Sequence, residues 1–330
     1  MNQLRRCLLT LVLLLGLADF CAAEDKTYTI AVIPKGTTHE FWRAVHAGAI
    51  KAQRELGEKG EKVELIWKGP LREDDRDQQI QVVENFMTRH VSGILLAPLD
   101  SQSLAGPVAN AVRARIPVVI FDSALKSDKY VSFVATDNYK GGQMAGQRMG
   151  ELLGGKGNII VLRYGVGSAS TEAREAGFLD TIKDKFPSIK VLSSDQYAGA
   201  TRETAYQASQ NLVNRFGREL DGAFAPNEPA IISLTKAIKD VGKAGGKVKL
   251  VGFDAGQQSI IDLKNGDVQG LVVQDPMRMG YLGVLTLVKH LDGETVEKRI
   301  DTGVQLITPE NMDEPAMKAL LHPPLEMYLN

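Results

Sequence analysis

Short apolar runs rich in β-branched residues alternate with longer stretches of helical periodicity along most of the chain. In the first part, the pattern predicts strands at residues 28–33, 63–67, 93–97 and 117–121. Helices are predicted between them at residues 41–56, 73–90 and 102–114. Because apolar strands that alternate with helices are typical of a parallel sheet covered on both faces, this part predicts an α/β fold.

The same alternation restarts after residue 137. It predicts strands at residues 158–162, 189–192, 222–225, 248–251 and 270–273. The helices predicted with them are residues 138–153, 171–185, 202–216, 229–241 and 256–264. Periodicity alone assigns neither a last helix near 276–291 nor the segment from residue 300 onward to one half. We therefore expect two α/β lobes of similar size, with no low-complexity linker between them.

The first 23 residues have the pattern of a secretory signal peptide. Two arginines precede an apolar stretch at residues 8–18, which is too short to span a bilayer stably. Small residues in Cys21-Ala22-Ala23 then predict cleavage after Ala23, with a buried N-terminal helix as the alternative. Cleavage would leave 307 of the 330 residues, none of them cysteine. The mature chain would then hold no disulfide, thiolate nucleophile or Cys-ligated metal.

Composition and charge narrow the class of partner. With 44% hydrophobic residues, the chain can bury a substantial core, unlike a disordered protein. Its 39 basic and 40 acidic residues give a formal net charge of −1, which becomes −2 when Arg5, Arg6 and Asp19 leave with the signal peptide. Because no basic excess is present to neutralise a phosphate backbone, nucleic acid is not an expected partner.

Motifs of common enzyme classes are missing from the sequence. It has no G-x-S-x-G, H-E-x-x-H or Walker A motif, and the stretch 165–170 ends in serine where G-x-G-x-x-G requires glycine. We therefore expect no catalytic residue, no metal and no cofactor. The histidines show no ligand spacing, and His46 and His90 are expected on solvated helix faces. The charge run at residues 72–77 is expected to cap and solvate a helix, without a binding role, and Trp67 lies either in the core or in a cleft.

Polar and aromatic residues follow several of the predicted strands, at the edge where parallel α/β sheets bind ligands. They are Lys35, His39, Phe41, Trp42, Asp122, Ser123, Arg163, Glu172, Arg174, Asn227, Glu228, Asp254, Gln274 and Asp275. Carboxylates accept hydrogen bonds from vicinal hydroxyls, Arg and Asn donate to oxygens, and aromatic faces cover C–H surface. Each Asp or Asn could instead only cap the next helix. Their convergence from two facing lobes predicts a site for a polyhydroxylated ligand.

On these residues the sequence resembles the sugar-binding proteins of bacterial ABC importers, above all the ribose-type branch. The resemblance covers nearly all of the mature chain. Its motifs are His39-Glu-Phe-Trp42 with Gly48, Ile120-Phe-Asp122, Thr136-Asp-Asn138 with Gly141-Gly142, Ala173-Arg-Glu-Ala-Gly-Phe178, Ala225-Pro-Asn-Glu228, Val251-Gly-Phe-Asp254 and Gln274. The family implies a type I periplasmic binding protein, in which two Rossmann-like lobes with parallel sheets are joined by a hinge of three crossings. The crossings map near 136–137, 275 and 302, which gives lobes of 24–136 plus 276–302 and of 137–275 plus 303–330.

The resemblance also implies roles for single residues. Phe41 and Trp42 would cover the sugar ring, and Asp122 and Asp254 would accept hydrogen bonds from its hydroxyls. Donation by Arg174 and contacts from Asn227 and Gln274 would complete the site. His39 stands where ribose binders carry Asn, and Ser123 where they carry Arg. Lys35 after Pro34, and the Lys68-Gly69-Pro70 turn, resemble the rhamnose and autoinducer-2 branch, so the ligand need not be ribose.

The expected function is that of an exported, monomeric, periplasmic protein that closes over one small sugar or polyol and delivers it to an ABC permease in the inner membrane. One alternative is presentation to a chemoreceptor or sensor kinase, and another is an autoinducer-2-like, non-sugar ligand. A secreted hydrolase that uses Asp122 and Asp254 is the enzyme alternative. A transcriptional regulator is disfavoured, because the predicted signal peptide occupies the place of a DNA-binding headpiece.

Overall fold

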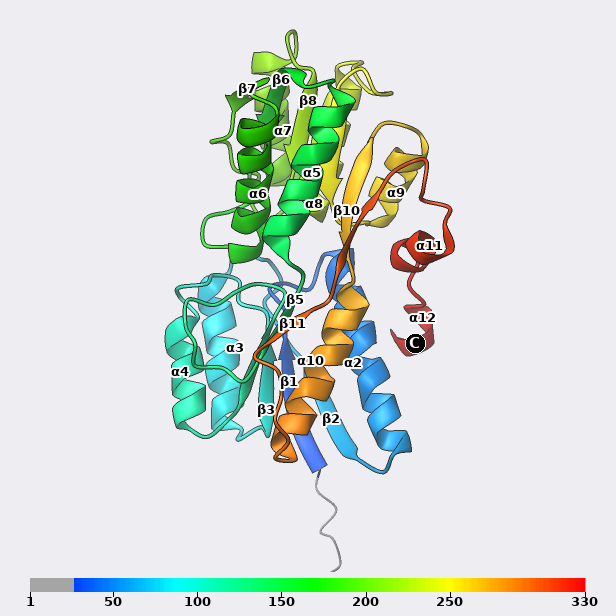
Figure 1. Cartoon of the computed structure of the whole chain (residues 1–330). Coiled ribbons are helices and arrows are strands. Elements are labelled where there is room, and N and C mark those ends of the chain that lie inside the picture. Colours follow the sequence, from blue (N-terminus) through cyan, green and yellow to red (C-terminus); the bar gives the residue numbers. More distant parts are fainter. Residues whose placement is uncertain (1–26, 330) are drawn as a thin grey trace, which may run out of the picture.

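Two six-stranded sheets form the centres of two α/β lobes, stacked end to end in the computed structural model, which describes residues 27–329 (Figure 1). The predicted signal peptide, residues 1–23, lies outside the described residues. Within residues 27–329, no helix combines the length and the apolar character needed to cross a membrane. The predicted fold class, two α/β lobes built on largely parallel sheets, is confirmed.

The first lobe has the strand order β11-β5-β4-β3-β1-β2, with every neighbouring pair parallel. Its strands are β1 (Thr27–Ile33), β2 (Lys62–Trp67), β3 (Gly93–Leu96), β4 (Val118–Phe121), β5 (Phe133–Ala135) and β11 (Arg299–Asp301). Its helices are α2 (Glu40–Glu58), α3 (Arg76–Thr88), α4 (Ala105–Arg113) and α10 (Pro276–Leu291). Alternate residues of β1 face opposite layers: Ile30 packs with α2 and α10, whereas Ala31 packs with α3 and α4.

The second lobe repeats this plan with the order β12-β10-β9-β8-β6-β7. Its strands are β6 (Lys156–Val161), β7 (Ser188–Ser193), β8 (Gly222–Ala225), β9 (Lys249–Phe253), β10 (Gly270–Gln274) and β12 (Val304–Ile307). Its helices are α5 (Asn138–Leu152), α6 (Ala169–Lys185), α7 (Arg202–Phe216), α8 (Glu228–Asp240) and α9 (Gln257–Lys264). The prediction of parallel sheets needs one correction, because β12 runs antiparallel to β10.

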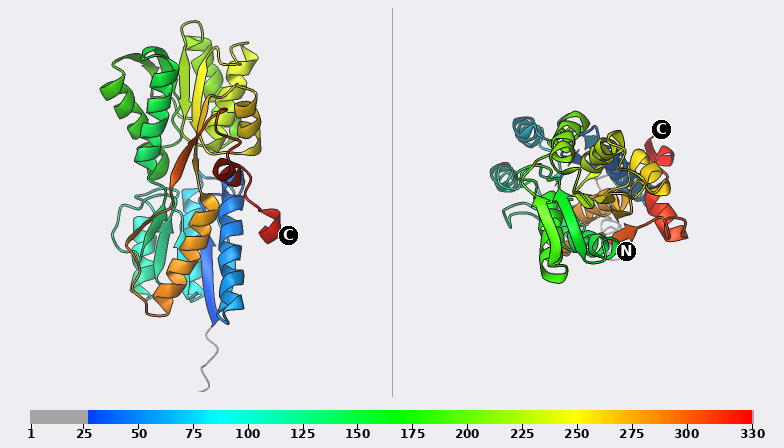
Figure 2. Two further views of the ribbon diagram at one scale, coloured as in Figure 1. Left: turned by 45° about the vertical axis from the view of Figure 1, so that its right-hand side comes forward. Right: turned by 90° about the horizontal axis from the view of Figure 1, so that it is seen from above.

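The chain passes between the sheets three times, after β5, after β10 and between β11 and β12. We propose the lobe division that the sequence predicts, 24–136 plus 276–302 and 137–275 plus 303–330. The C-terminal tail crosses that division. Helix α11 (Pro315–Leu321) buries Leu321 in the core of the second lobe, whereas α12 (Glu326–Leu329) lies against α2 of the first (Figures 1 and 2).

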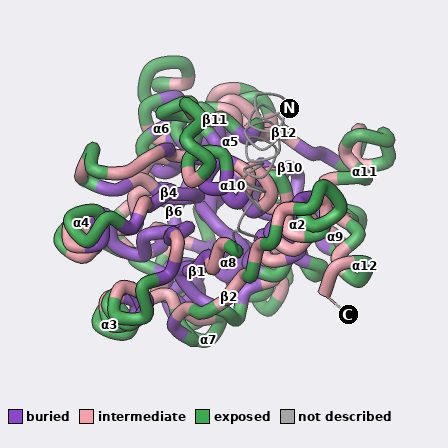
Figure 3. Tube along the Cα trace, turned by 90° about the horizontal axis from the view of Figure 1, so that it is seen from below, coloured by how far each residue is buried: buried purple, intermediate pink, exposed green. Residues whose placement is uncertain are grey.

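Close helix contacts depend on glycine. A Cβ atom on Gly48 of α2 would lie 1.8 Å from the carbonyl oxygen of Met277 in α10, and one on Gly280 would lie 2.0 Å from that of Val45. The backbones of these two helices therefore touch. Figure 3 shows the burial of the described residues, with buried strands inside and exposed residues on the outer helices and loops.

The position of His46 differs from the solvated helix face expected for it, and the position of Trp67 decides between the core and a cleft. The ring of His46 stacks on that of Trp67, with centroids 4.4 Å apart and planes at 15°, so His46 is half-buried rather than on a solvated face. Trp67 packs against the first-lobe core. His90 is exposed, as expected, in the turn after α3.

Candidate ligand-binding cleft

Side chains from both lobes meet at the carboxyl ends of the two sheets and enclose a small space, here called the polar cavity. Its lining consists of Lys35, His39, Phe41, Trp42, Glu73 and Asp122 from the first lobe, and of Ser170, Thr171, Arg174, Asn227, Glu228, Pro229, Asp254 and Gln274 from the second. Ten of the fourteen residues that the sequence analysis places after strands are among them. Ser123, Arg163, Glu172 and Asp275 do not line this cavity. The enclosed volume is about 30 Å³, enough for a water molecule but not for a sugar ring.

Asp122 and Asp254 directly follow β4 and β9, one in each lobe. Both adopt the left-handed backbone region, with φ of 60° and 69°, and both are almost fully buried. Aspartate enters this region more easily than most residues, yet the conformation still costs free energy. Such strain is found preferentially at functional sites, where the surrounding fold holds it in place. Here it turns both carboxylates toward the polar cavity.

Arg174 projects from α6 and is fixed on several sides. Its Nε donates to Asn138 Oδ1 at 2.8 Å, and its Nη1 donates to the Pro226 carbonyl at 2.9 Å. The guanidinium lies 3.8 Å from Asp254 Oδ2 and covers the ring of Phe253 at 4.5 Å. With 2% of its surface exposed, this buried cation is held in place by groups of the protein itself.

Asp254 and Gln274 form a hydrogen-bonded pair. Gln274 Nε2 donates to Asp254 Oδ1 at 2.7 Å, and the Glu228 backbone N–H donates to Oδ2 at 3.1 Å. Burial raises the pKa of Asp254, although Arg174 and Gln274 act in the opposite direction. The other amide atom, Gln274 Oε1, is buried and accepts no hydrogen bond from any described residue. An unpaired buried acceptor is costly, so this oxygen is a candidate acceptor for a donor outside the described residues.

Lys35 and Ser123 join the first lobe to the N-terminal end of α6 in the second. Lys35 Nζ lies 3.0 Å from Asp122 Oδ2 and donates to Ser170 Oγ at 2.9 Å. Ser123 Oγ accepts from the Ser170 backbone N–H at 3.1 Å, which occupies it in a contact between lobes. Asn227 has a second duty as well, because its side chain caps α8 at the Ala230 N–H. Asn227 therefore caps a helix and also lines the polar cavity.

Glu73 corrects the interpretation of the charge run at residues 72–77. Its neighbour Asp75 does cap α3, by accepting from the Gln78 N–H. The side chain of Glu73, however, is 7% exposed and lines the polar cavity. It pairs with His39 Nδ1 at 2.6 Å and accepts from Trp42 Nε1 at 2.7 Å. It also accepts from the hydroxyl of Tyr164, in the other lobe, at 2.9 Å.

These contacts set opposite pKa shifts on the two partners. Burial disfavours the charged form of His39, but the Glu73 carboxylate outweighs it and raises the pKa of His39 to about 9. Burial likewise disfavours charged Glu73, but His39, Lys35 and the Trp42 N–H lower the pKa of Glu73 to about 2. Both groups are therefore ionised at neutral pH. The sequence signal that could have located Glu73 is its place in the loop that follows β2.

The two aromatic residues of α2 differ in burial. Trp42 is 3% exposed and packs edge-on against Phe121, with ring centroids 6.1 Å apart. Phe41 is half-buried at the cavity, and its backbone N–H donates to Glu228 Oε2 across the lobes at 3.2 Å. Both rings line the polar cavity, where a flat apolar surface can cover the C–H face of a ring.

Two α/β lobes that close a buried polar cavity between them define a binding protein for a small polar solute. The chain belongs to the periplasmic binding protein domain family, which it matches over residues 30–295.

Known members of this family resemble the chain over most of its length. The ribose import binding protein of Haemophilus influenzae is 31% identical over 301 residues, which cover 91% of this chain and 98% of that protein. An ABC transporter solute-binding protein of Agrobacterium vitis, solved with bound D-fucose, is 38% identical with a TM-score of 0.84, over 89% of this chain and 100% of that one. A carbohydrate transporter solute-binding protein of Agrobacterium radiobacter, solved with D-arabinose, is 34% identical with a TM-score of 0.84, over 90% and 99%.

Proposed function

We propose that this protein captures an uncharged sugar or polyol between its two lobes in the periplasm and delivers it to an ABC permease of the inner membrane. It acts as a monomer, exported by the signal peptide at residues 1–23, and it catalyses no reaction. One observation carries the proposal: buried carboxylates from both lobes, Asp122 and Asp254, converge with Arg174 on one enclosed cavity. The sugars bound by its relatives support the same ligand class.

The charges of the polar cavity favour a neutral ligand. Its cations are Lys35, Arg174 and protonated His39, and each lies beside a carboxylate. Glu228 adds a further acidic group, whose pKa is raised by burial. A phosphate or carboxylate on the ligand would therefore meet no free cation there and would lose its hydration. Hydroxyl groups, which both donate and accept, suit this mixed lining.

Lobe closure provides the mechanism. A ligand held by Asp122 on one side and by Asp254 on the other contacts both lobes only when they are closed, so binding shifts the population toward that form. The chain connections after β5, after β10 and between β11 and β12 would bend as the lobes part. A permease can then recognise the loaded protein by its closed shape.

Calorimetry on the mature protein tests the proposal, with D-ribose, D-arabinose, D-fucose and xylitol as ligands. We expect at least one to bind, and Asp254→Asn to weaken that binding by at least tenfold, because a hydrogen bond to a charged group is lost. Asp313→Asn, at a solvent-exposed carboxylate of the tail, is the matched control and should bind normally. Absence of binding across a broad sugar and polyol panel, or turnover of a nitrophenyl glycoside, would refute the proposal.

A further inference from the structure

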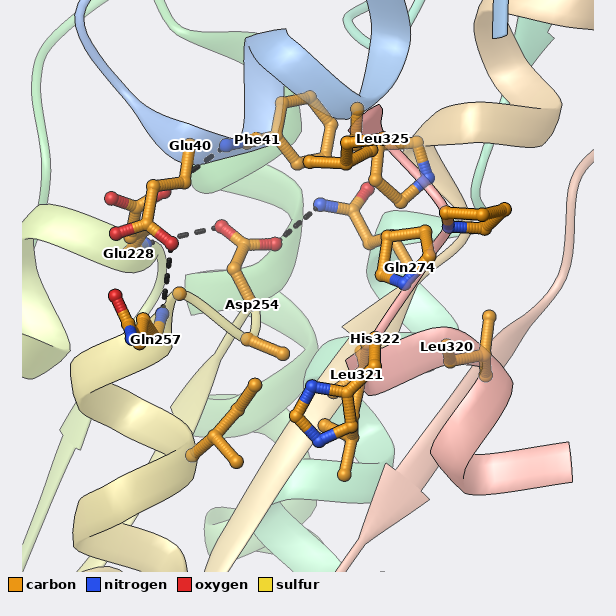
Figure 4. A pocket seen from close by; sticks show the side chains of 18 of the residues that line it. Glu40, Phe41, Glu228, Asp254, Gln257, Gln274, Leu320, Leu321, His322 and Leu325 are labelled. Atoms are coloured by element: carbon orange, nitrogen blue, oxygen red, sulfur yellow. Dashed lines mark hydrogen bonds between the residues drawn. The ribbon is translucent and has the colours of Figure 1, made fainter. Parts of the chain in front are cut away.

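A second, larger space adjoins the polar cavity, and we call it the outer chamber (Figure 4). Its volume is about 780 Å³. The two spaces share four lining residues, Phe41, Glu228, Asp254 and Gln274. The outer chamber therefore lies next to the proposed sugar site, with those four residues in the wall between them.

The walls of the outer chamber have two characters. The lining includes the carboxylates of Glu228 and Asp254 and the amide of Gln274. It also includes apolar side chains, Ile260 from α9 and Leu320, Leu321 and Leu325 from the tail. Figure 4 shows the Gln274 amide beside Asp254, on the side toward Phe41 and Leu325. The unpaired Gln274 Oε1 therefore lies at the boundary of the two spaces, where it can accept from a ligand hydroxyl.

The C-terminal tail forms one side of the chamber and is anchored at both ends. Leu321 is buried in the second-lobe core. Beyond it, Arg54 of α2 donates to the Met327 carbonyl at 2.7 Å and to the Tyr328 carbonyl at 3.3 Å. The chamber is thus built from both lobes and the tail together, whereas no tail residue lines the polar cavity.

We propose that the ligand of this protein is a glycoside, a sugar that carries an apolar alkyl or aryl group. The polar cavity is too small for a sugar ring as it stands, so the lobes must lie farther apart around the ligand than they do here. The sugar ring then occupies the widened polar cavity, one of its hydroxyls donates to Gln274 Oε1, and the apolar group enters the outer chamber. This inference rests on the proposed function and names its ligand class. A bare monosaccharide would leave the leucine-lined wall against water, whereas an apolar group would cover it and gain affinity in proportion to the area buried.

Matched probes test the ligand class by calorimetry: the methyl and 4-nitrophenyl glycosides of D-ribose, D-arabinose and D-fucose, in both anomeric forms. For the sugar that binds best, we expect one 4-nitrophenyl anomer to bind at least tenfold more tightly than its methyl counterpart, from burial of the aromatic ring. Equal or weaker binding of all 4-nitrophenyl glycosides would overturn this inference and leave the proposed function intact. Failure of every sugar and glycoside to bind would overturn both.

A charged substitution at an apolar residue of the outer chamber tests whether the aryl group lies there. Leu325→Asp should weaken binding of the 4-nitrophenyl glycoside about tenfold and change binding of the methyl glycoside less than twofold, because a carboxylate there disfavours an apolar neighbour. Val241→Asp introduces the same charge at an exposed position outside the chamber and should change neither affinity. An equal loss for both glycosides in Leu325→Asp would instead assign the tail a general role in closure and would overturn the placement of the aryl group.

Discussion

The Glu73 carboxylate links three donors in two lobes, and its removal is the sharpest test of the electrostatics described above. Glu73→Gln keeps the size of the side chain but removes its charge beside His39, Trp42 and Tyr164. In the variant, burial acts on His39 against only the smaller contributions of Glu228 and of the hydrogen bond to the Ala200 backbone, so the pKa of His39 should fall. A larger share of His39 would then be neutral at pH 7.

The magnitude follows from the pKa of His39. A rise from 6.5 to about 9 corresponds to about 3 kcal/mol of stabilisation, since a tenfold change in proton affinity is worth about 1.4 kcal/mol. This contribution is fully present below pH 6.5 and is lost as the pH rises through about 9. The lowered pKa of Glu73 reports the same ion pair from its other partner, so the two values are not added. On the acid side, the pair is lost as the pH falls from 4.5 toward about 2.

Urea unfolding, followed by tryptophan fluorescence near pH 6 and again near pH 9.5, measures the difference. Between these conditions the wild-type protein should lose about 3 kcal/mol more free energy of unfolding than Glu73→Gln does. Asp74→Asn, at the exposed neighbouring carboxylate, should behave like the wild type. Parallel losses in the wild type and Glu73→Gln would refute the assignment of a charged His39–Glu73 pair.

Two further predictions concern the packing of helix α2 and the contacts of the C-terminal tail. Gly48→Ala should lower the free energy of unfolding by about 1–3 kcal/mol, because its Cβ meets the Met277 backbone. Gly57→Ala, in the same helix, has open space around its Cβ and should raise the free energy of unfolding by about 0.5–1 kcal/mol. Thermal or urea unfolding measures both changes. Deleting residues 322–330 removes the contacts of the tail with Arg54, and we expect sugar dissociation to accelerate roughly two- to tenfold in stopped-flow measurements. An unchanged dissociation rate would show that the tail does not hold the closed form.

Long periodic segments were predictable from the sequence because their pattern repeats over several turns or a whole buried strand. The prediction of residues 202–216 coincides with α7, and that of 222–225 with β8. Strands β5 and β11 have three residues each, too few for a period to register, and their pairing joins segments far apart in the chain. The antiparallel addition of β12 depends on the third crossing, which no local pattern records.

The candidate site was predictable where the functional side chain directly follows a strand. Asp122 and Asp254 are such residues, since the end of the strand fixes where each carboxylate lies. Glu73 follows β2 only after a loop, within a run of charges whose other members are mostly exposed, so its burial depends on Tyr164 and His39 from elsewhere in the chain. Ser170 escaped prediction because its role depends on the closeness of the two lobes.

In the proposed function, ligand capture by this cleft exchanges existing hydrogen bonds for new ones more than it adds hydrogen bonds. In the closed structure Lys35 donates to Ser170, and Gln274 Nε2 donates to Asp254, so a sugar that takes over these groups must break existing bonds. Each such exchange contributes little net free energy, because one hydrogen bond replaces another. Gln274 Oε1 differs, since it is the single cavity atom among the buried, unpaired side-chain oxygens and nitrogens of residues 27–329. A ligand hydroxyl aimed at that oxygen removes an existing penalty, so its position on the sugar ring should decide which sugar this protein prefers.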